Sequence, residues 1–222
     1  MHKSQSDITY VDYTSTKELM ENSKIDPHVK QGDIVAVDIN LAESGSTETL
    51  QTRGPFDYIV ASHVFEYLPN LLEWLEKKLG LLCEGGIISL AIPDKRYTFD
   101  YFRRLSEPSD WLTAYIDSNV RPTTAQLLNH FLNVRVVNTQ EAWDKKPILS
   151  NCPRYHDDEI AMDLTRKGQL DYVDCHCFVY TDSSFIAIFN VLQSMNLMLN
   201  LETVEIFPPE RATPMSLSYL YV

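Results

Sequence analysis

Polar side chains follow an apolar run in the stretch FDYIVASHVFEYLP, residues 56–69. The apolar residues 58–61 are followed by Ser62 and His63, and Glu66 comes three residues after the histidine. An imidazole titrates near neutral pH, so His63 is a candidate general base toward a hydroxyl. Chains leaving parallel strands turn over the carboxyl edge of the sheet, where α/β proteins bind ligands. We therefore predict that His63 is functional and that Glu66 only starts the next helix, where a carboxylate favours the positive helix end.

A second polar group follows another apolar run, in IPDKRYTFDYFRR, residues 92–104. The guanidinium of Arg96 can hold a carboxylate or phosphate with two hydrogen bonds, and Lys95 can act as a point charge. We predict that Asp94, Lys95 and Arg96 bind the substrate. The alternative is a solvated turn whose charges pair with one another. The stretch also contains three further charged residues, Asp100, Arg103 and Arg104.

Two more histidines are candidates for the same site. His176, in VDCHCF, is a second catalytic candidate, and the neighbouring Asp174 is the carboxylate expected to orient it. His130, in LLNHFLNV, is predicted to contribute to substrate binding, although its apolar surroundings are also typical of a core histidine. For each candidate histidine a purely structural role is the alternative.

Cysteine usage indicates reduced thiols, because four cysteines at uneven spacing do not form a secreted disulfide framework. By residue type alone, a tetrahedral zinc site could be assembled from Cys152, His156, Cys175 and Cys177. The spacing is not typical of zinc sites, and small buried thiols explain the same residues. We predict no metal.

Composition and charge exclude several classes of protein. With 44% hydrophobic residues, a chain of 222 residues can bury a full core as one domain. The formal net charge of −12 opposes sequence-independent binding to nucleic acid or to anionic membranes. No apolar run approaches the roughly 20 residues that span a bilayer, and the polar start lacks the apolar core of a signal peptide. We expect a cytoplasmic protein without membrane insertion.

The order of the elements predicts parallel βαβ units. The residue patterns predict strands over 8–13, 33–39, 56–62 and 85–93, and helices over 15–23 and 68–82. Ser15 and Glu18 have the spacing of a capping box, and Gly85 and Gly86 are predicted to end the second helix. Residues 95–180 lose this rhythm and are predicted to form an insertion or lid. A helix over 181–196 and two antiparallel strands over 201–209 and 217–222 close the chain.

The block FDYIVASHVFEYLPNLLEWLEKKLGLLCEGGIISLAIPDKRYTFD, residues 56–100, resembles class I S-adenosylmethionine-dependent methyltransferases. The resemblance is to a bacterial branch with Ser-His-Val after the fourth strand and Pro-Asp-Lys-Arg after the fifth. It implies one α/β domain over residues 1–222, with a Rossmann-like, mostly parallel sheet and a C-terminal antiparallel strand. It also implies methyl transfer from S-adenosylmethionine to a small-molecule or glycan-like acceptor.

The resemblance assigns further residues to the cofactor. Asp12 stands where the family binds the cofactor ribose, and Asp38 stands near the adenine position. Ser62 and His63 would face the cofactor or the transferred methyl group. For Asp12 and Asp38 the alternative is a turn role, since aspartate commonly caps turns and helix starts.

The sequence departs from the family at the glycine-rich loop. The first strand and this loop should precede residue 8, and none of the seven glycines forms a Gly-x-Gly. Glycine is needed there because only a residue without Cβ permits both the tight turn and a close approach of the ligand. The chain is therefore expected to be an N-terminally truncated or degenerate relative. The alternative function is a catalytically inactive interaction or scaffolding module that pairs with a protein partner or a second copy.

Overall fold

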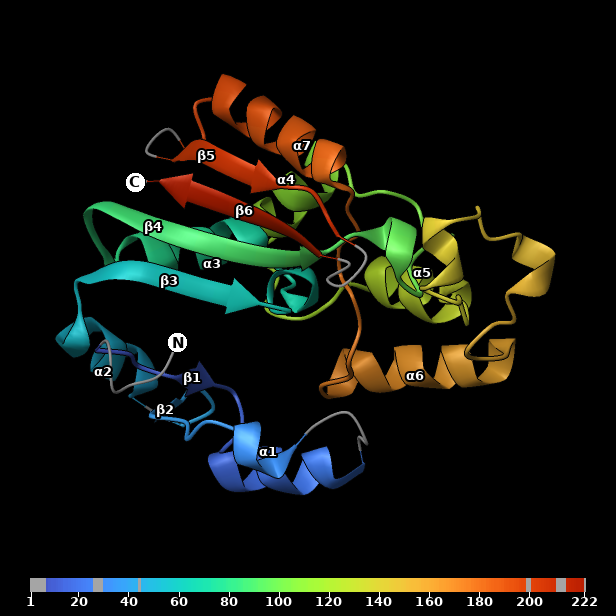
Figure 1. Ribbon diagram of the computed structural model, residues 1–222, viewed down its shortest axis with the longest axis horizontal. Helices are drawn as coiled ribbons and strands as arrows, with labels where there is room; N and C mark the ends of the chain where they lie inside the picture. The colour runs from blue at the N-terminus through green and yellow to red at the C-terminus, as the bar shows by residue number, and fades with distance from the viewer. Residues whose placement is uncertain (1–6, 26–29, 44, 199–200, 211–214, 222) are drawn as a thin grey trace. The chain divides into compact units, whose positions relative to one another are not determined.

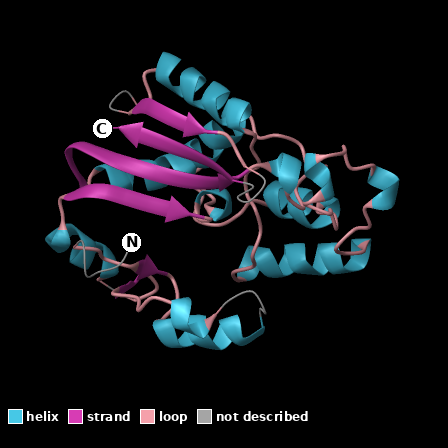
Figure 2. Cartoon of the chain, in the orientation of Figure 1, coloured by secondary structure: helices cyan, strands magenta, loops and turns pink. Residues whose placement is uncertain are grey.

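The chain forms two compact units, residues 1–56 and 57–222, and has a mixed α/β fold. The computed structural model describes residues 7–25, 30–43, 45–198, 201–210 and 215–221. Figure 2 shows helices and strands in both units. Within the described ranges, we find no helix with the length and apolar character needed to cross a membrane.

The first unit is built around one short parallel strand pair. Its elements are β1 Val11–Asp12, α1 Thr16–Asn22, η1 Ser23–Ile25, η2 Gln31–Asp33, β2 Ile39–Asn40 and α2 Ser46–Arg53, where η marks a 3₁₀ helix. The predicted order of strand, helix and strand is confirmed, and so is the Ser15–Glu18 capping box of α1. The strands are shorter than predicted, because backbone N–H groups before β2 have other partners. Val37 donates to Thr16 Oγ1, for example.

The second unit contains a four-stranded sheet in the order β3-β4-β6-β5. The strands are β3 Phe56–Ser62, β4 Leu82–Pro93, β5 Glu202–Phe207 and β6 Met215–Tyr221. Figure 1 shows the arrows of β3 and β4 pointing in the same direction. β6 is antiparallel to both β4 and β5, which confirms the predicted pairing of the last two strands. Three strands thus run one way, and the C-terminal strand runs against them.

Helix α3, Leu71–Leu79, connects β3 to β4 and is shorter than predicted. Asn70 caps its N-terminus by accepting from the Glu73 N–H, and the chain leaves the helix at Gly80. Leu82 and the Gly85–Gly86 pair belong to β4, so the prediction that these glycines end the helix is wrong. Gly85 has a φ of +77°, which a residue without Cβ tolerates inside the strand.

Three helices cover one face of the sheet and form its core. Figure 1 shows α3 and α4, Pro108–Ile116, behind the strands, with α7, Asp182–Ser194, along the β5 side. The predicted helix is confirmed, and Thr181 begins it with a capping box. Trp111 of α4 is fully buried and packs its ring edge-to-face against Phe65 and Phe185. Ile88 and Leu90 supply the sheet side of this core.

The predicted insertion contains two of the longer helices, α5 Thr124–Asn133 and α6 Asp158–Leu170, which pack against each other. The second unit also contains short 3₁₀ helices: η3 Phe65–Tyr67, η4 Lys95–Tyr97, η5 Glu141–Trp143 and η6 Leu149–Asn151. The insertion returns to the sheet through residues 175–180.

Gly168 of α6 is expected to be essential for this helix packing. A Cβ at residue 168 would lie 2.6 Å from Val173 Cγ2 and 2.7 Å from Leu127 Cδ2, so Gly168→Ala should destabilise the protein by about 1–3 kcal/mol. Gly80→Ala is the matched control, because a Cβ there meets only backbone oxygens at 3.7 Å or more. Urea unfolding of both variants measures the difference, and equal stabilities would contradict the close packing.

Candidate functional site

Three chain segments meet at the carboxyl ends of β3 and β4, and we call this region the sheet edge: residues 62–67, 94–103 and 175–180. The His63 N–H donates to the Ala91 carbonyl oxygen at 3.1 Å, which places the two strand ends side by side. The Cys177 N–H donates to Glu66 O at 2.7 Å, and the Lys95 N–H donates to Tyr180 O at 2.9 Å. Residues distant in sequence are therefore brought together at the edge where ligands bind in open α/β sheets.

His63 lies at this edge in an unusual backbone conformation. Its φ of +53° is in the left-handed region, which is uncommon for residues other than glycine. Its side chain is 56% exposed, and Nδ1 lies 3.4 Å from Glu66 Oε1. The interaction with Glu66 raises the pKa of His63, against the opposing effect of partial burial. Ser62, the last residue of β3, is also exposed.

Glu66 does not have the role expected from the sequence. It lies in η3, ahead of α3, and its side chain is 2% exposed. The chain makes a 3₁₀ turn here because Phe65 must enter the core beside Trp111. The prediction that Glu66 starts the next helix is therefore wrong, because α3 begins at Leu71 and the Glu66 carboxylate is buried beside His63.

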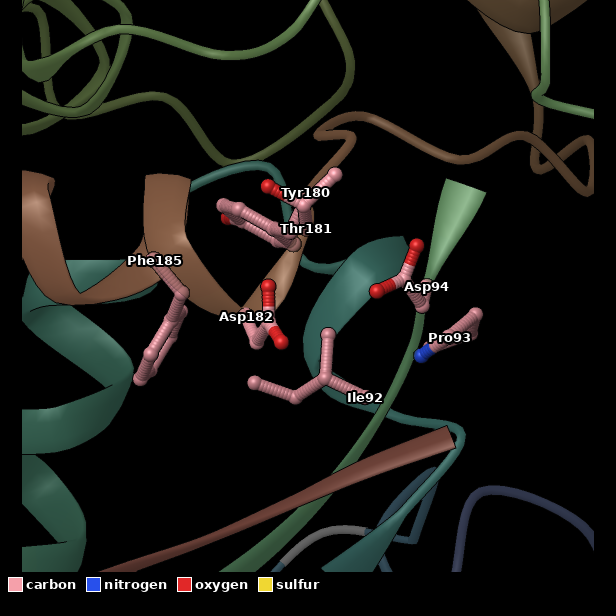
Figure 3. Close-up of a pocket in the computed structure, with 7 residues that line it drawn as sticks. All are labelled: Ile92, Pro93, Asp94, Tyr180, Thr181, Asp182 and Phe185. Carbon is pink, nitrogen blue, oxygen red and sulfur yellow. The ribbon is translucent and has the colours of Figure 1, made fainter. Parts of the chain in front are cut away.

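Asp94 and Arg96 are joined to each other. Arg96 Nε donates to Asp94 Oδ1 at 2.9 Å, and its Nη2 donates to Asp182 Oδ1 at 3.0 Å. Figure 3 shows Asp94 with Asp182 and Tyr180 around a small pocket between the end of β4 and the start of α7. The pocket has room for about one water molecule. This geometry matches the alternative of internally paired charges.

Lys95 is also engaged within the protein. Its Nζ donates to the backbone oxygen of Arg103, and burial lowers the pKa of Lys95. Of the predicted substrate-binding residues, only Asp94 lines the small pocket of Figure 3.

A buried charge network connects the second and third segments. His176 Nδ1 lies 2.6 Å from Asp100 Oδ2, and Arg103 Nη1 donates to Asp100 Oδ1 at 2.8 Å. Arg103 Nη2 also donates to His176 O at 2.8 Å. Burial alone would raise the pKa of Asp100, but His176 and Arg103 lower it, so this carboxylate is held ionised. A carboxylate lies beside His176, as predicted, but it belongs to Asp100 and not to Asp174.

The expected partner, Asp174, accepts a hydrogen bond from the Tyr172 hydroxyl at 2.5 Å. The sequence contains one indication of the Asp100–Arg103 pair. Asp100 and Arg103 are spaced i, i+3 within an aromatic stretch, and such a charge pair is buried when its aromatic neighbours enter a core.

His130 supports this network from α5. Its Nδ1 accepts the His176 N–H at 3.2 Å, and burial, followed by the nearby charge of Arg103, lowers the pKa of His130 to about 3. A histidine that stays neutral and accepts a backbone hydrogen bond is a structural residue. This is the core role that the sequence left open.

The cysteines do not gather around His156. Cys175 and Cys177 have their Sγ atoms 4.0 Å apart, and within the described ranges no three His, Cys, Asp or Glu side chains are grouped to hold a metal ion. Interaction with Cys177 lowers the pKa of the Cys175 thiol.

Asp12 and Asp38, the two predicted cofactor residues of the first unit, both accept hydrogen bonds within that unit. Asp12 Oδ1 accepts both the N–H and the hydroxyl of Thr14 at 2.8 Å, which is an Asx turn. Asp38 Oδ2 accepts the Tyr10 N–H at 2.8 Å and so joins the two strands of this unit.

No protein-family model matches the chain, and a search of curated proteins finds no match.

Proposed function

We propose that this chain takes part in methyl transfer from S-adenosylmethionine to a small-molecule or glycan-like acceptor, and that its second unit supplies the acceptor side of the site. The observation that carries the proposal is the sheet itself. Adjacent strands β3 and β4 end side by side with polar residues, and the C-terminal strand β6 runs against them, as the resemblance implies.

The sheet edge supports this reading because it offers two histidines, each beside a carboxylate. His63 has Glu66, and His176 has Asp100. Transfer to a hydroxyl requires removal of its proton near neutral pH, and a carboxylate-oriented imidazole is suited to that task. His63 is the stronger candidate of the two, because its side chain is 56% exposed whereas that of His176 is 5% exposed.

The described residues do not fit the cofactor itself. Asp12 Oδ1 already accepts hydrogen bonds from Thr14. The chain also contains no Gly-x-Gly, which would let a backbone loop approach the methionine part of the cofactor. Gly45, with a φ of +81°, is the N-cap of α2 and is not part of a glycine-rich loop. We therefore assign no reaction step to the cofactor.

Calorimetric titration with S-adenosylmethionine tests whether this chain lacks a complete cofactor site. Without a glycine loop, we expect a Kd of about 1 mM or weaker. If binding is measurable, Asp12→Asn should weaken it more than Asp38→Asn, because a carboxylate on a ribose diol makes charged hydrogen bonds worth about 1.5–3 kcal/mol. A low-micromolar Kd would show that the cofactor site is complete in a form that we have not recognised.

An interaction module is the second candidate, and the surface of β3 favours it. Tyr58 and Val60 are each 62% exposed on this strand, which is the first in the sheet order and has one neighbour among the described strands. Exposed apolar side chains on an edge strand favour pairing with another chain.

Transfer of labelled methyl groups discriminates the two functions. The chain is incubated with about 1 mM labelled S-adenosylmethionine, to allow for weak binding, and with a panel of sugars and other hydroxyl compounds. Label in an acceptor supports methyl transfer. An unlabelled panel together with dimers in sedimentation would favour the interaction module.

A further inference from the structure

We infer that Glu66 is a positioning residue for His63, and that the two form an acid–base pair in which His63 Nε2 accepts the proton of an acceptor hydroxyl or amine. The inference rests on the proposed function for the identity of the acceptor, but the pair itself is defined by geometry.

The first observation is that the Glu66 carboxylate has the ionisable His63 as its neighbour and no hydrogen-bond partner. Glu66 is 1% exposed, and by strict geometry neither of its carboxylate oxygens has a hydrogen-bond partner within the described residues. His63 Nδ1, at 3.4 Å from Oε1, forms the single ion pair found for this carboxylate in the described part of the chain. A buried carboxylate is costly unless it is paired, so the pairing with His63 is what makes this burial tolerable.

The surroundings of Glu66 offer few alternatives. The hydroxyl of Tyr180 is buried without a hydrogen-bond partner by the same strict geometry. Burial is the main cause that raises the pKa of Tyr180 and of Tyr67, and the charge of Glu66 adds to it. Both phenols therefore lie within the influence of this carboxylate. The imidazole of His63, in contrast, is 56% exposed.

The second observation is the backbone at His63. The left-handed φ of +53° occurs at the point where β3 ends and η3 begins, three residues before the carboxylate. A non-glycine residue in this region has a conformational cost, and such conformations cluster at functional sites. The turn holds Nδ1 against Glu66 and leaves Nε2 as the ring nitrogen available to a ligand.

The chemistry of the pair follows from these positions. In the Nδ1–H tautomer, which the nearby Glu66 Oε1 favours, neutral His63 has its lone pair on Nε2 and can take a proton from an acceptor O–H or N–H. The electron pair of the broken bond stays on the acceptor atom and makes it a nucleophile. The imidazolium so formed is stabilised by the Glu66 carboxylate and returns its proton to water.

The pair also sets a pH window. Glu66 raises the pKa of His63 above its ordinary value of 6.5, through the side-chain interaction first and its charge second, while burial opposes the shift. Because the folded pKa is the higher one, the stabilisation from the pair is fully present below pH 6.5 and is lost as the pH rises through the folded pKa. The base form of His63 therefore appears above that folded pKa.

The inference is tested by ¹H–¹⁵N NMR titration of the histidine rings in the full chain, with His63 assigned by its loss in His63→Asn. In the parent we expect a His63 pKa above 6.5 and, at high pH, the Nδ1–H tautomer. In Glu66→Gln the pKa should fall to or below 6.5, because burial then dominates. Glu73→Gln is the matched control, since Glu73 lies on α3 and pairs with Lys77, and it should leave the His63 titration unchanged.

Two outcomes would overturn the inference: equal His63 titrations in the parent and Glu66→Gln, or an Nε2–H tautomer in the parent. The tautomer is measured in the parent alone, so the test stands even if Glu66→Gln fails to fold. Neither measurement requires a cofactor or turnover, so a failure of methyl transfer is distinguished from a failure of the pair.

Discussion

Replacing Asp100 with asparagine is expected to lower the free energy of unfolding by about 3–5 kcal/mol. The Asp100 side chain is 3% exposed and the Arg103 side chain is 1% exposed, with their atoms 2.8 Å apart. Removing the carboxylate charge leaves a guanidinium that cannot deprotonate in the interior, and asparagine keeps only one of the two oxygens that face Arg103 and His176. Urea denaturation monitored by circular dichroism measures the loss.

The matched control is Asp163→Asn on the surface of α6. Asp163 and Arg166 have the same i, i+3 spacing and lie 2.9 Å apart, but their side chains are 68% and 67% exposed. Exposed pairs contribute about 0–1 kcal/mol, so this variant should be close to the parent. If Asp100→Asn were no more destabilising than Asp163→Asn, the buried network would not exist as described.

The same network makes stability depend on acid pH. His176 and Arg103 together outweigh burial and lower the pKa of Asp100 below its ordinary value of 3.8. For a carboxylate with a lowered folded pKa, the stabilisation is present above the unfolded pKa and is lost as the pH falls through the folded pKa. The stability difference between the parent and Asp100→Asn should therefore be constant above about pH 5 and shrink below pH 3.8.

Features of the fold that depend on neighbouring residues were predicted from the sequence. The capping box of α1 involves hydrogen bonds between residues three apart, and the pairing of β5 with β6 involves consecutive strands. The predicted end of α3 is wrong, because it relies on Gly85 and Gly86 as the helix stop. The chain instead turns at Gly80 and tolerates the later glycines within β4.

The partners within the site were harder to predict, because they depend on tertiary contacts. His176 and Asp100 are 76 positions apart, and sequence alone favoured Asp174, two residues from His176. The role of Glu66 was missed for a similar reason, since its burial depends on where Phe65 packs. Residue types and strand ends thus point to a candidate site at this edge of the sheet, but not to which carboxylate lies beside which histidine.

His63→Asn is expected to lower turnover by about 100-fold or more in any form of the protein that transfers a methyl group to a hydroxyl, because the general base is lost. Asparagine is the sharpest replacement, since it tolerates the left-handed backbone at position 63 and keeps a polar amide beside the buried Glu66. Alanine would leave no polar side chain there and confuse a loss of folding with a loss of chemistry.

The contrast with His130 separates chemistry from structure. His130→Ala removes the acceptor of the buried His176 N–H, so it should cost about 1–3 kcal/mol of stability, and any loss of activity should follow the loss of folded protein. His63→Asn should retain the parent's unfolding midpoint at pH 8 while losing turnover. A His63→Asn variant that stays fully active at pH 8 would move the proton-accepting role away from His63, and His176, oriented by Asp100, would then be the next residue to replace.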